Sequence, residues 1–421
     1  GVAFPNEKDI EILGGNYVNP TMQPYSACYA GHQFGNWAGQ LGDGRAITLG
    51  EWPLENGKSA EFQLKGAGLT PYSRRADGRA VLRSSLREYL MSEAMHYLGV
   101  PTTRALSLVT TGEPVLRDMF YNGNAAYEPG AIVLRVAPSF LRFGNFEMLA
   151  ARNEVDNLRR LVEWTIDKYF PETEGEGEER ILNWYKEVVG LTAQLMVEWQ
   201  RVGFVHGVMN TDNMSILGLT IDYGPYSFVD EYDFNFTPNT TDLPGRRYAF
   251  GKQPSVAFWN LGCLAGAIAP LFKNTKDIVT AGEAFREVYF GNYYQMMANK
   301  LGFEQADKEL VELISKLEKL LQLLKPDMTI FYQLLVNINL KEGDKVAWID
   351  HLNDAFYKPL SDQQSLKLAE FLDEYKSLKE NRAVATLQAA ALMQKANPRF
   401  ILRNYLLQEA IDEIENGGSS K

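Results

Sequence analysis

Residues 204–213 read FVHGVMNTDN, and residues 216–224 read ILGLTIDYG. The first segment follows a helical pattern over 182–199, where apolar side chains recur at three- and four-residue spacings. The second segment is expected to form a short apolar hairpin. Asn213 and Asp222 therefore stand on adjacent loops, and an amide oxygen and a carboxylate so placed can hold a divalent cation against nucleotide phosphates.

The spacing of these residues matches kinase-like enzymes. There, a His-x-Asp-x-x-x-x-Asn loop supplies a base and a metal ligand, and the Asp of an Asp-Phe-Gly turn supplies a second ligand. His206, Asn213 and Asp222 stand at these positions. Val208 replaces the usual base and can neither accept a proton nor bind metal, so Asp212 is assigned the role of base as a hypothesis. The alternative is that Asp212 and Asn213 only tighten a turn.

A second pair of residues supports the comparison with kinases. Lys65 closes a predicted strand, and Glu88 lies on the next predicted helix. Kinases place a strand lysine and its helix glutamate in this order, and such a pair would hold Lys65 against phosphate oxygens. A surface ion pair worth roughly 0–1 kcal/mol is the alternative.

The predicted elements define an α+β chain with a two-lobed, protein-kinase-like fold. Strands are expected at 46–49, 60–65, 106–109 and 131–136, with Asn56-Gly57 as a hairpin turn and a helix over 79–98. The glycine-rich segment 31–44 is interpreted as a loop before the first strand. After Pro138 helical patterns dominate, including 308–324 and one helix within 387–415. We predict a small β-rich N-lobe, 1–138, and a large helical C-lobe, 139–421.

Several residues in the first lobe could contact phosphate. Gly42 and Gly44 would let backbone amides approach a phosphate, and Arg45 adds a charged fork. A plain turn before a strand is the more common explanation of such glycines. Arg135 and Arg142, near the predicted hinge, could reach phosphates from the cleft wall. Arg135 lies in an apolar strand, so it needs a partner, which could be a carboxylate instead of a ligand.

Composition narrows the range of partners and compartments. The 421 residues include 53 acidic and 42 basic side chains, a net charge of −11, so nucleic acid is not an expected partner. Cys28 and Cys263 are the two cysteines, which excludes a disulfide framework and a four-cysteine zinc site. No apolar run approaches the ~20 residues of a membrane-spanning helix, so no membrane association is expected. We expect a cytoplasmic protein if the source is bacterial and a mitochondrial one if it is eukaryotic.

The sequence resembles the selenoprotein O family, whose members have a kinase fold. The resemblance is carried by residues 29–35, 40–46, 64–68, 77–85, 206–225 and 397–405, and so spans nearly the whole chain. It implies transfer of AMP from ATP, and also of UMP from UTP, to Ser, Thr or Tyr hydroxyls of proteins. It further implies that the nucleotide binds inverted relative to ordinary kinases. Attack at the α-phosphate would then explain why Val208 replaces the usual Asp.

The resemblance also assigns roles by motif position. Asp212 resembles the base of the family, and Asn213 and Asp222 resemble its Mg²⁺ or Mn²⁺ ligands. The residues that resemble its nucleotide-binding set are Gly42, Gly44, Arg45, Lys65, Asp77, Gly78, Arg135 and Arg142, with Glu88 as the partner of Lys65.

Two other functions compete with protein nucleotidylation. A small-molecule phosphotransferase of the antibiotic-kinase type would need Asp where Val208 stands. A catalytically inactive nucleotide-binding scaffold would have no use for Lys65, Glu88, Asp212 and a full metal site together. Both alternatives are weaker than nucleotidyl transfer, and labelled ATP distinguishes all three.

Overall fold

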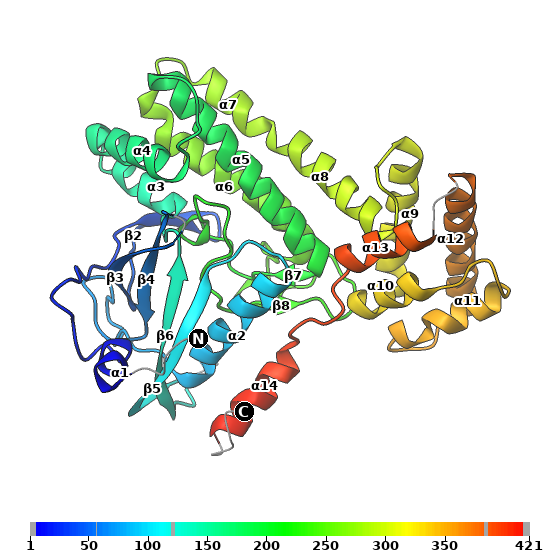
Figure 1. Ribbon diagram of the computed structural model, residues 1–421, viewed down its shortest axis with the longest axis horizontal. Helices are drawn as coiled ribbons and strands as arrows, with labels where there is room; N and C mark the ends of the chain where they lie inside the picture. Colours follow the sequence, from blue (N-terminus) through cyan, green and yellow to red (C-terminus); the bar gives the residue numbers. More distant parts are fainter. Residues whose placement is uncertain (1–5, 56, 119–122, 383–385, 416–421) are drawn as a thin grey trace.

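The computed structural model describes residues 6–55, 57–118, 123–382 and 386–415. It is a mixed α+β structure in which the main sheet lies at one side and the helices extend away from it (Figure 1). The strands of this sheet all fall between residues 46 and 137, and from residue 143 onward the described chain is mostly helical.

One antiparallel sheet dominates the N-terminal part. Its strands lie in the order β3 (Ala46–Pro53), β4 (Ser59–Lys65), β6 (Ala126–Ala137) and β5 (Arg104–Arg117). Helix α2 (Leu82–Tyr97) packs against β5 and β6, while α1 (Glu7–Leu13) covers a small apolar cluster formed by β3, β4 and β6. The expected strands and helix are therefore confirmed, although β3, β5 and β6 are longer than predicted and α2 begins three residues later. Of the predicted turn, Asn56 lies outside the described residues.

The segment 31–44 differs from the prediction. Instead of a loop, it contains a second, separate hairpin of β1 (Ala30–Gln33) and β2 (Asn36–Gln40). Phe34 and Gly35 form its turn with positive φ angles of 50° and 83°. A strand rich in glycine has weak β propensity, so the sequence pattern did not reveal it.

The helices form the rest of the molecule. They are α3 (Phe143–Ala151), α4 (Val155–Tyr169), α5 (Gly177–Val202), α6 (Gln253–Ile268), α7 (Lys276–Glu283), α8 (Phe285–Lys300), α9 (Lys308–Leu324), α10 (Met328–Asn337), α11 (Lys345–Leu352), α12 (Asp362–Asn381), α13 (Thr386–Ala396) and α14 (Asn404–Glu415). Helix α9 has the predicted bounds. Where one helix was expected within 387–415, the structure has two, α13 and α14, because the chain breaks at Pro398 between them.

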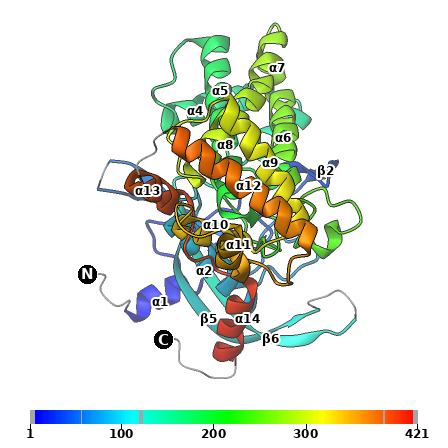
Figure 2. The ribbon, with the colours of Figure 1, turned by 90° about the vertical axis from the view of Figure 1, so that its right-hand side faces the viewer.

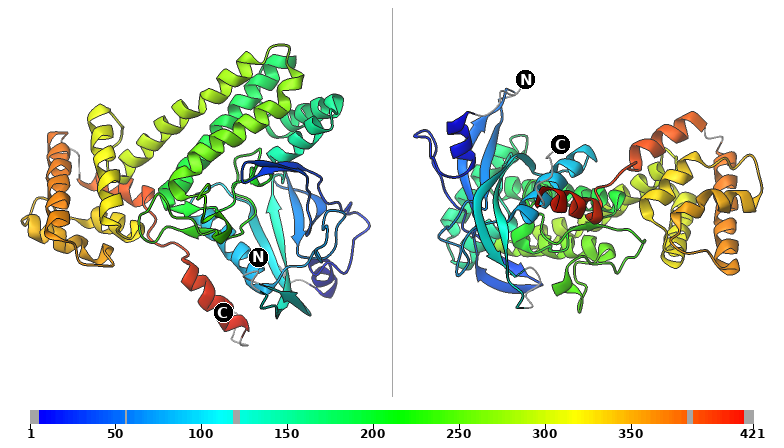
Figure 3. Two further views of the ribbon diagram at one scale, coloured as in Figure 1. Left: turned by 180° about the vertical axis from the view of Figure 1, so that it is seen from behind. Right: turned by 90° about the horizontal axis from the view of Figure 1, so that it is seen from below.

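The last helices lie in two places. In Figure 2, α12 crosses α9 on the side away from the sheet, and these two helices are in contact. Helix α14 instead runs back beside α2 (Figures 1 and 3). An Arg87 Nη1 to Asn404 Oδ1 hydrogen bond of 3.1 Å joins these two helices. The end of the described chain therefore supports the helix that carries Glu88.

The segment 204–228 contacts both the chain before β5 and the chain before α3. Strands β7 (Phe204–Val205) and β8 (Ser227–Phe228) pair with each other, and a 3₁₀ turn spans Thr211–Asn213. The hairpin expected in the segment 216–224 was wrong, since no strand is present there. Thr220 instead bridges to Thr102, just before β5, and Ser215 bridges to Arg142, just before α3.

One helical segment is apolar enough to qualify as a membrane span by length and composition alone. The segment runs from Phe250 to Leu271. An 18-residue window within it has a mean hydropathy of 1.3, and half of this window is buried inside the molecule. The expectation that no run approaches this length was therefore wrong. The segment contains α6, which packs against α3, α5 and α7. A core helix accounts for this pattern.

Candidate active site

A cleft of about 1160 Å³ brings most of the predicted site residues together. Those that line it are Gly42, Gly44, Arg45, Lys65, Asp77, Gly78, Arg135, Asp212, Asn213 and Asp222. Glu88 and Arg142 are buried beside it and contact the lining residues Lys65 and Asp222. The cleft wall thus combines residues from the sheet with residues of the 204–228 segment.

The predicted pair of Lys65 and Glu88 is confirmed as a contact. Lys65 Nζ lies 2.6 Å from Glu88 Oε2, and both side chains are buried. Burial lowers the pKa of Lys65, and the neighbouring carboxylates oppose this effect. Burial alone would raise the pKa of Glu88, but Lys65 and Arg135 outweigh it, so the pKa is lowered. The surface ion-pair interpretation is therefore wrong for these two residues.

Asp222 is surrounded by three cations. Its Oδ1 lies 2.5 Å from Arg135 Nη1 and 3.4 Å from Lys65 Nζ, and its Oδ2 lies 2.6 Å from Arg142 Nη1. Burial would raise the pKa of Asp222, but Arg142, Lys65 and Arg135 together hold it well below its usual range. Asp222 therefore stays ionised, as a cation ligand must. Arg135 also reaches Glu88 at 2.9 Å, so its expected partner is a carboxylate.

Asp212 lies in a different environment. Its side chain is buried; Oδ2 accepts a 3.2 Å hydrogen bond from Gln33 Nε2, and Oδ1 has no hydrogen-bond partner among the described residues. Burial raises the pKa of Asp212 to about 6, and Gln33 and Arg142 limit the rise. Two neighbouring carboxylates with pKa values pushed in opposite directions are typical of an acid–base site. Asp212 suits proton transfer, and Asp222 suits charge binding.

Asn213 and Asp222 offer the donor atoms of a divalent-cation site. Asn213 Nδ2 donates to the Val208 carbonyl at 3.0 Å, which leaves the amide oxygen as its ligand atom. An amide oxygen and an ionised carboxylate fit Mg²⁺ or Mn²⁺ better than a thiol-preferring metal. Both residues line the same cleft. The residues present therefore fit such an ion.

The glycines and Asp77 have clear structural roles in the cleft wall. A Cβ on Gly42 would come within 2.4 Å of the Tyr72 ring, and one on Gly78 within 2.0 Å of the Gly68 carbonyl oxygen. Asp77 Oδ1 lies 2.7 Å from Arg117 Nη2, so its carboxylate is already paired. These residues shape the wall where backbone groups could meet a nucleotide.

Sequence reasoning missed one carboxylate. Asp43 is buried, accepts a 3.1 Å hydrogen bond from the Ala27 amide, and lies 3.9 Å from Arg142 Nη2. Burial raises its pKa despite the arginines. Its position between Gly42 and Gly44 was the available signal, but an Asp between glycines is also an ordinary turn residue.

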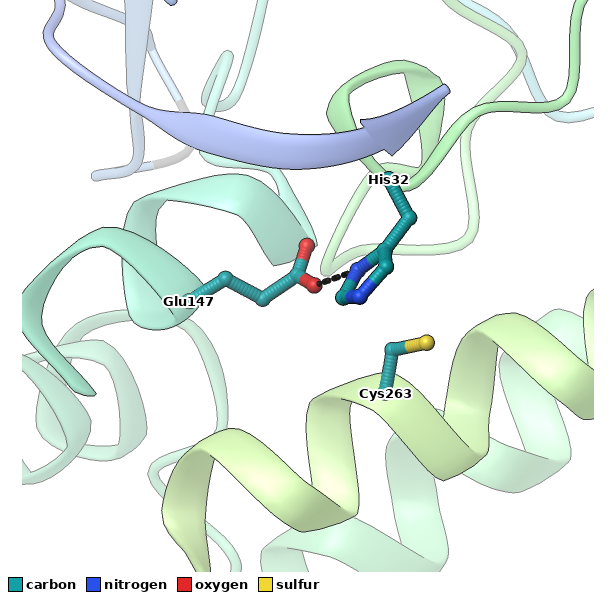
Figure 4. A group of neighbouring side chains, drawn as sticks. All are labelled: His32, Glu147 and Cys263. Carbon is teal, nitrogen blue, oxygen red and sulfur yellow. Dashed lines mark hydrogen bonds and ion pairs between the residues drawn. The ribbon is translucent and has the colours of Figure 1, made fainter. Parts of the chain in front are cut away.

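A further group of potential ligands lies outside this cleft. Ligand atoms of His32, Glu147 and Cys263 fall within 4.8 Å of one another (Figure 4). His32 Nδ1 and Glu147 Oε1 are already hydrogen-bonded at 2.6 Å, and burial raises the pKa of the Cys263 thiol to about 12. A metal would have to displace a proton from that thiol, so the His–Glu hydrogen bond is the better explanation.

The raised pKa of Asp212 predicts a measurable effect on stability. Its folded pKa of about 6 lies above the ordinary value of 3.8, so ionisation destabilises the folded state. This penalty is absent below about pH 4, grows between pH 4 and 6, and is complete above that range. Asp212→Asn should therefore raise the free energy of unfolding by about 1–3 kcal/mol at pH 8. Urea unfolding at pH 5 and pH 8 measures it, and an equal or larger gain at pH 5 would contradict the assignment.

Comparison with known proteins agrees with the site. A family model described as protein adenylyltransferase SelO matches residues 3–420. The chain belongs to the SelO family. It is 58% identical over 417 residues to the protein nucleotidyltransferase YdiU of Cytophaga hutchinsonii, covering 99% of this chain and 80% of that protein. It is 54% identical over 411 residues to the YdiU protein of Xanthomonas campestris pv. campestris (strain B100), covering 97% and 79%.

Membership of the SelO family establishes the class of reaction. This chain is a protein nucleotidyltransferase of the adenylyltransferase type, which uses a nucleoside triphosphate such as ATP and modifies proteins. The expected family and enzyme class are therefore confirmed.

Proposed function

We propose that this SelO-family enzyme transfers AMP from ATP, and UMP from UTP, to Ser, Thr or Tyr hydroxyls of proteins. We further propose a two-lobed, protein-kinase-like fold with lobes at 1–138 and 139–421, Mg²⁺ or Mn²⁺ held by Asn213 and Asp222, and Asp212 as the general base. The observation that carries the proposal is the convergence of Asp212, Asn213 and Asp222 on one cleft, which Lys65 and Arg135 also line.

The cations of the cleft are suited to a triphosphate. Lys65, Arg135 and Arg142 are paired with Glu88, Asp222 and Asp43, so three cations face three carboxylates. A divalent cation at Asp222 would supply positive charge to the triphosphate. The cation would also replace the guanidinium groups of Arg135 and Arg142 as partners of the Asp222 carboxylate. Arg135 and Arg142 could then donate to phosphate oxygens, for which their forked geometry is well suited.

The proposed reaction is a substitution at the α-phosphorus. The acceptor hydroxyl oxygen forms a bond to the α-phosphorus, the bond between that phosphorus and the α,β-bridging oxygen breaks, and pyrophosphate leaves. The hydroxyl proton goes to the Asp212 carboxylate. A general base is most efficient when its pKa lies near the working pH, and the raised pKa of Asp212 favours this role. Val208, which also lines the cleft, has no part in the proton transfer.

Labelled nucleotides test the proposal. The enzyme is incubated with a protein extract whose own enzymes have been inactivated by heat and with Mg²⁺ or Mn²⁺, using ATP labelled at the α or the γ position and α-labelled UTP. We expect protein-bound label from both α-labelled nucleotides, none from γ-labelled ATP, and none with EDTA. Label from the γ position would indicate a phosphotransferase, and label from neither position would indicate an inactive scaffold.

A further inference from the structure

The β1–β2 hairpin, residues 30–40, belongs to a sequence motif that the proposed chemistry does not use. Among the described strands, β1 and β2 pair only with each other. Strand β1 packs against α3 and the 3₁₀ turn Thr211–Asn213. The hairpin is therefore separate from the main sheet, and one of its faces lies against the loop that carries Asp212.

Three consecutive residues of β1 and its turn hold three consecutive residues of that loop. The His32 amide donates to Thr211 Oγ1 at 2.7 Å, and the Gln33 side chain donates to Asp212 Oδ2 at 3.2 Å. The Phe34 amide donates to Asn210 Oδ1 at 3.2 Å. Two of these bonds are to the neighbours of Asp212 and one is to its carboxylate. All three acceptors are side-chain oxygens, so the hairpin holds the side chains of three successive loop residues.

Gly31 adds a steric requirement to these hydrogen bonds. A Cβ placed on Gly31 would lie 2.8 Å from Asp212 Oδ1 and 3.0 Å from Asp212 Cβ. These distances are shorter than real Cβ contacts, and Gly31 does not have the positive φ that would itself favour glycine. The absence of a side chain at Gly31 therefore leaves the space that the Asp212 carboxylate occupies.

The hairpin is anchored on its other side. His32 Nδ1 and Glu147 Oε1 on α3 are hydrogen-bonded at 2.6 Å, as Figure 4 shows. The His32 ring also lies 5.1 Å from the Trp37 ring and 5.4 Å from the Trp259 ring, measured between centroids. Buried Glu147 and the aromatic rings restrict the ring of His32. Gln33, the next residue, is thus presented to Asp212 from a fixed support.

We propose that the β1–β2 hairpin positions the base: Gln33 orients the Asp212 carboxylate by holding Oδ2, and Gly31 admits Oδ1. This inference rests on the proposed role of Asp212. Gln33 is assigned a positioning role because its side chain donates to Asp212 Oδ2. A general base contributes only when its oxygen lies in line with the acceptor hydroxyl, so loss of this orientation should lower turnover without changing nucleotide binding.

Two variants with a matched control test the proposal. Gln33→Leu removes the hydrogen bond to Asp212, and Gly31→Ala pushes on the carboxylate. Gln40→Leu is the control, because Gln40 has the same chemistry at the end of the same hairpin and its Oε1 accepts from Arg152 Nη2 at 2.6 Å. Initial rates give kcat and the KM for ATP, and circular dichroism with thermal unfolding shows whether each variant is folded.

We expect Gln33→Leu and Gly31→Ala to lower kcat by roughly ten- to a hundredfold, with KM for ATP within about twofold and Gln40→Leu unchanged. In the Asp212→Asn background, Gln33→Leu should add less than about a twofold change, because the two residues act as one unit. An unchanged kcat, a changed KM alone, or an undiminished effect in that background would overturn the proposal. If Asp212→Asn retains full activity, the proposed base is wrong. If Asp212→Asn is impaired but Gln33→Leu is fully active, the base stands and the positioning role of Gln33 is wrong.

Discussion

Asp222→Asn is expected to reduce kcat/KM for nucleotidyl transfer by about 10³-fold, because the carboxylate proposed to hold the divalent cation becomes a neutral amide. The triphosphate charge would then lack its compensation in the transition state. Initial rates with α-labelled ATP, measured over a range of Mn²⁺ and Mg²⁺ concentrations, check this. We expect the metal concentration required for half-maximal rate to rise as well.

Asparagine is the informative replacement at this position. Asp222 has a φ of 57°, a left-handed conformation that asparagine adopts more readily than most residues. Asp222→Ala should also abolish transfer, but it removes a carboxylate partner that buried Arg135 and Arg142 share, and breaking such a buried pair can cost about 3–5 kcal/mol. Thermal unfolding would separate that loss of stability from the loss of chemistry.

A control variant completes this experiment. Asp167→Asn makes the same chemical change in an ion pair with Arg180 at 2.7 Å, on α4 and α5 and away from the cleft. It should keep the wild-type rate. Turnover of Asp222→Asn equal to that of Asp167→Asn would rule out Asp222 as a metal ligand.

Much of the fold could be predicted because local patterns determine it. The hairpin of β3 and β4, the helix α2 and the helix α9 each carry a regular apolar spacing with clear end signals. The contact between Lys65 and Glu88 could be predicted as well. It required only a strand and the following helix in the order that kinases use, and this order is visible in the sequence.

The parts that could not be predicted depend on long-range contacts. Gln33 and Asp212 are 179 residues apart, and the sequence around either residue gives no sign that the two are in contact. The β1–β2 hairpin has no β-branched residue, and its glycines suggested a loop. The importance of Asp43 could not be predicted for the same reason. It lies close to Arg142, which follows the main sheet in the sequence.

Asp212→Asn is expected to lower kcat by about 10²–10⁴-fold, because the variant keeps the shape of the side chain but cannot accept a proton. The dissociation constant for ATP should stay within about twofold, since Asp212 is proposed to be a base and not a ligand. Single-turnover rates with α-labelled ATP and calorimetric titration of ATP measure the two quantities separately.

The pairing of these two measurements distinguishes Asp212 from its neighbours. A residue that binds the metal or the phosphates, as proposed for Asp222, affects affinity and rate together, whereas a base affects the rate of the chemical step alone. A large rise in the ATP dissociation constant of Asp212→Asn would make Asp212 a binding residue. In that case the acceptor proton must leave by another route, and the unpaired Oδ1 of Asp212 would need a different explanation.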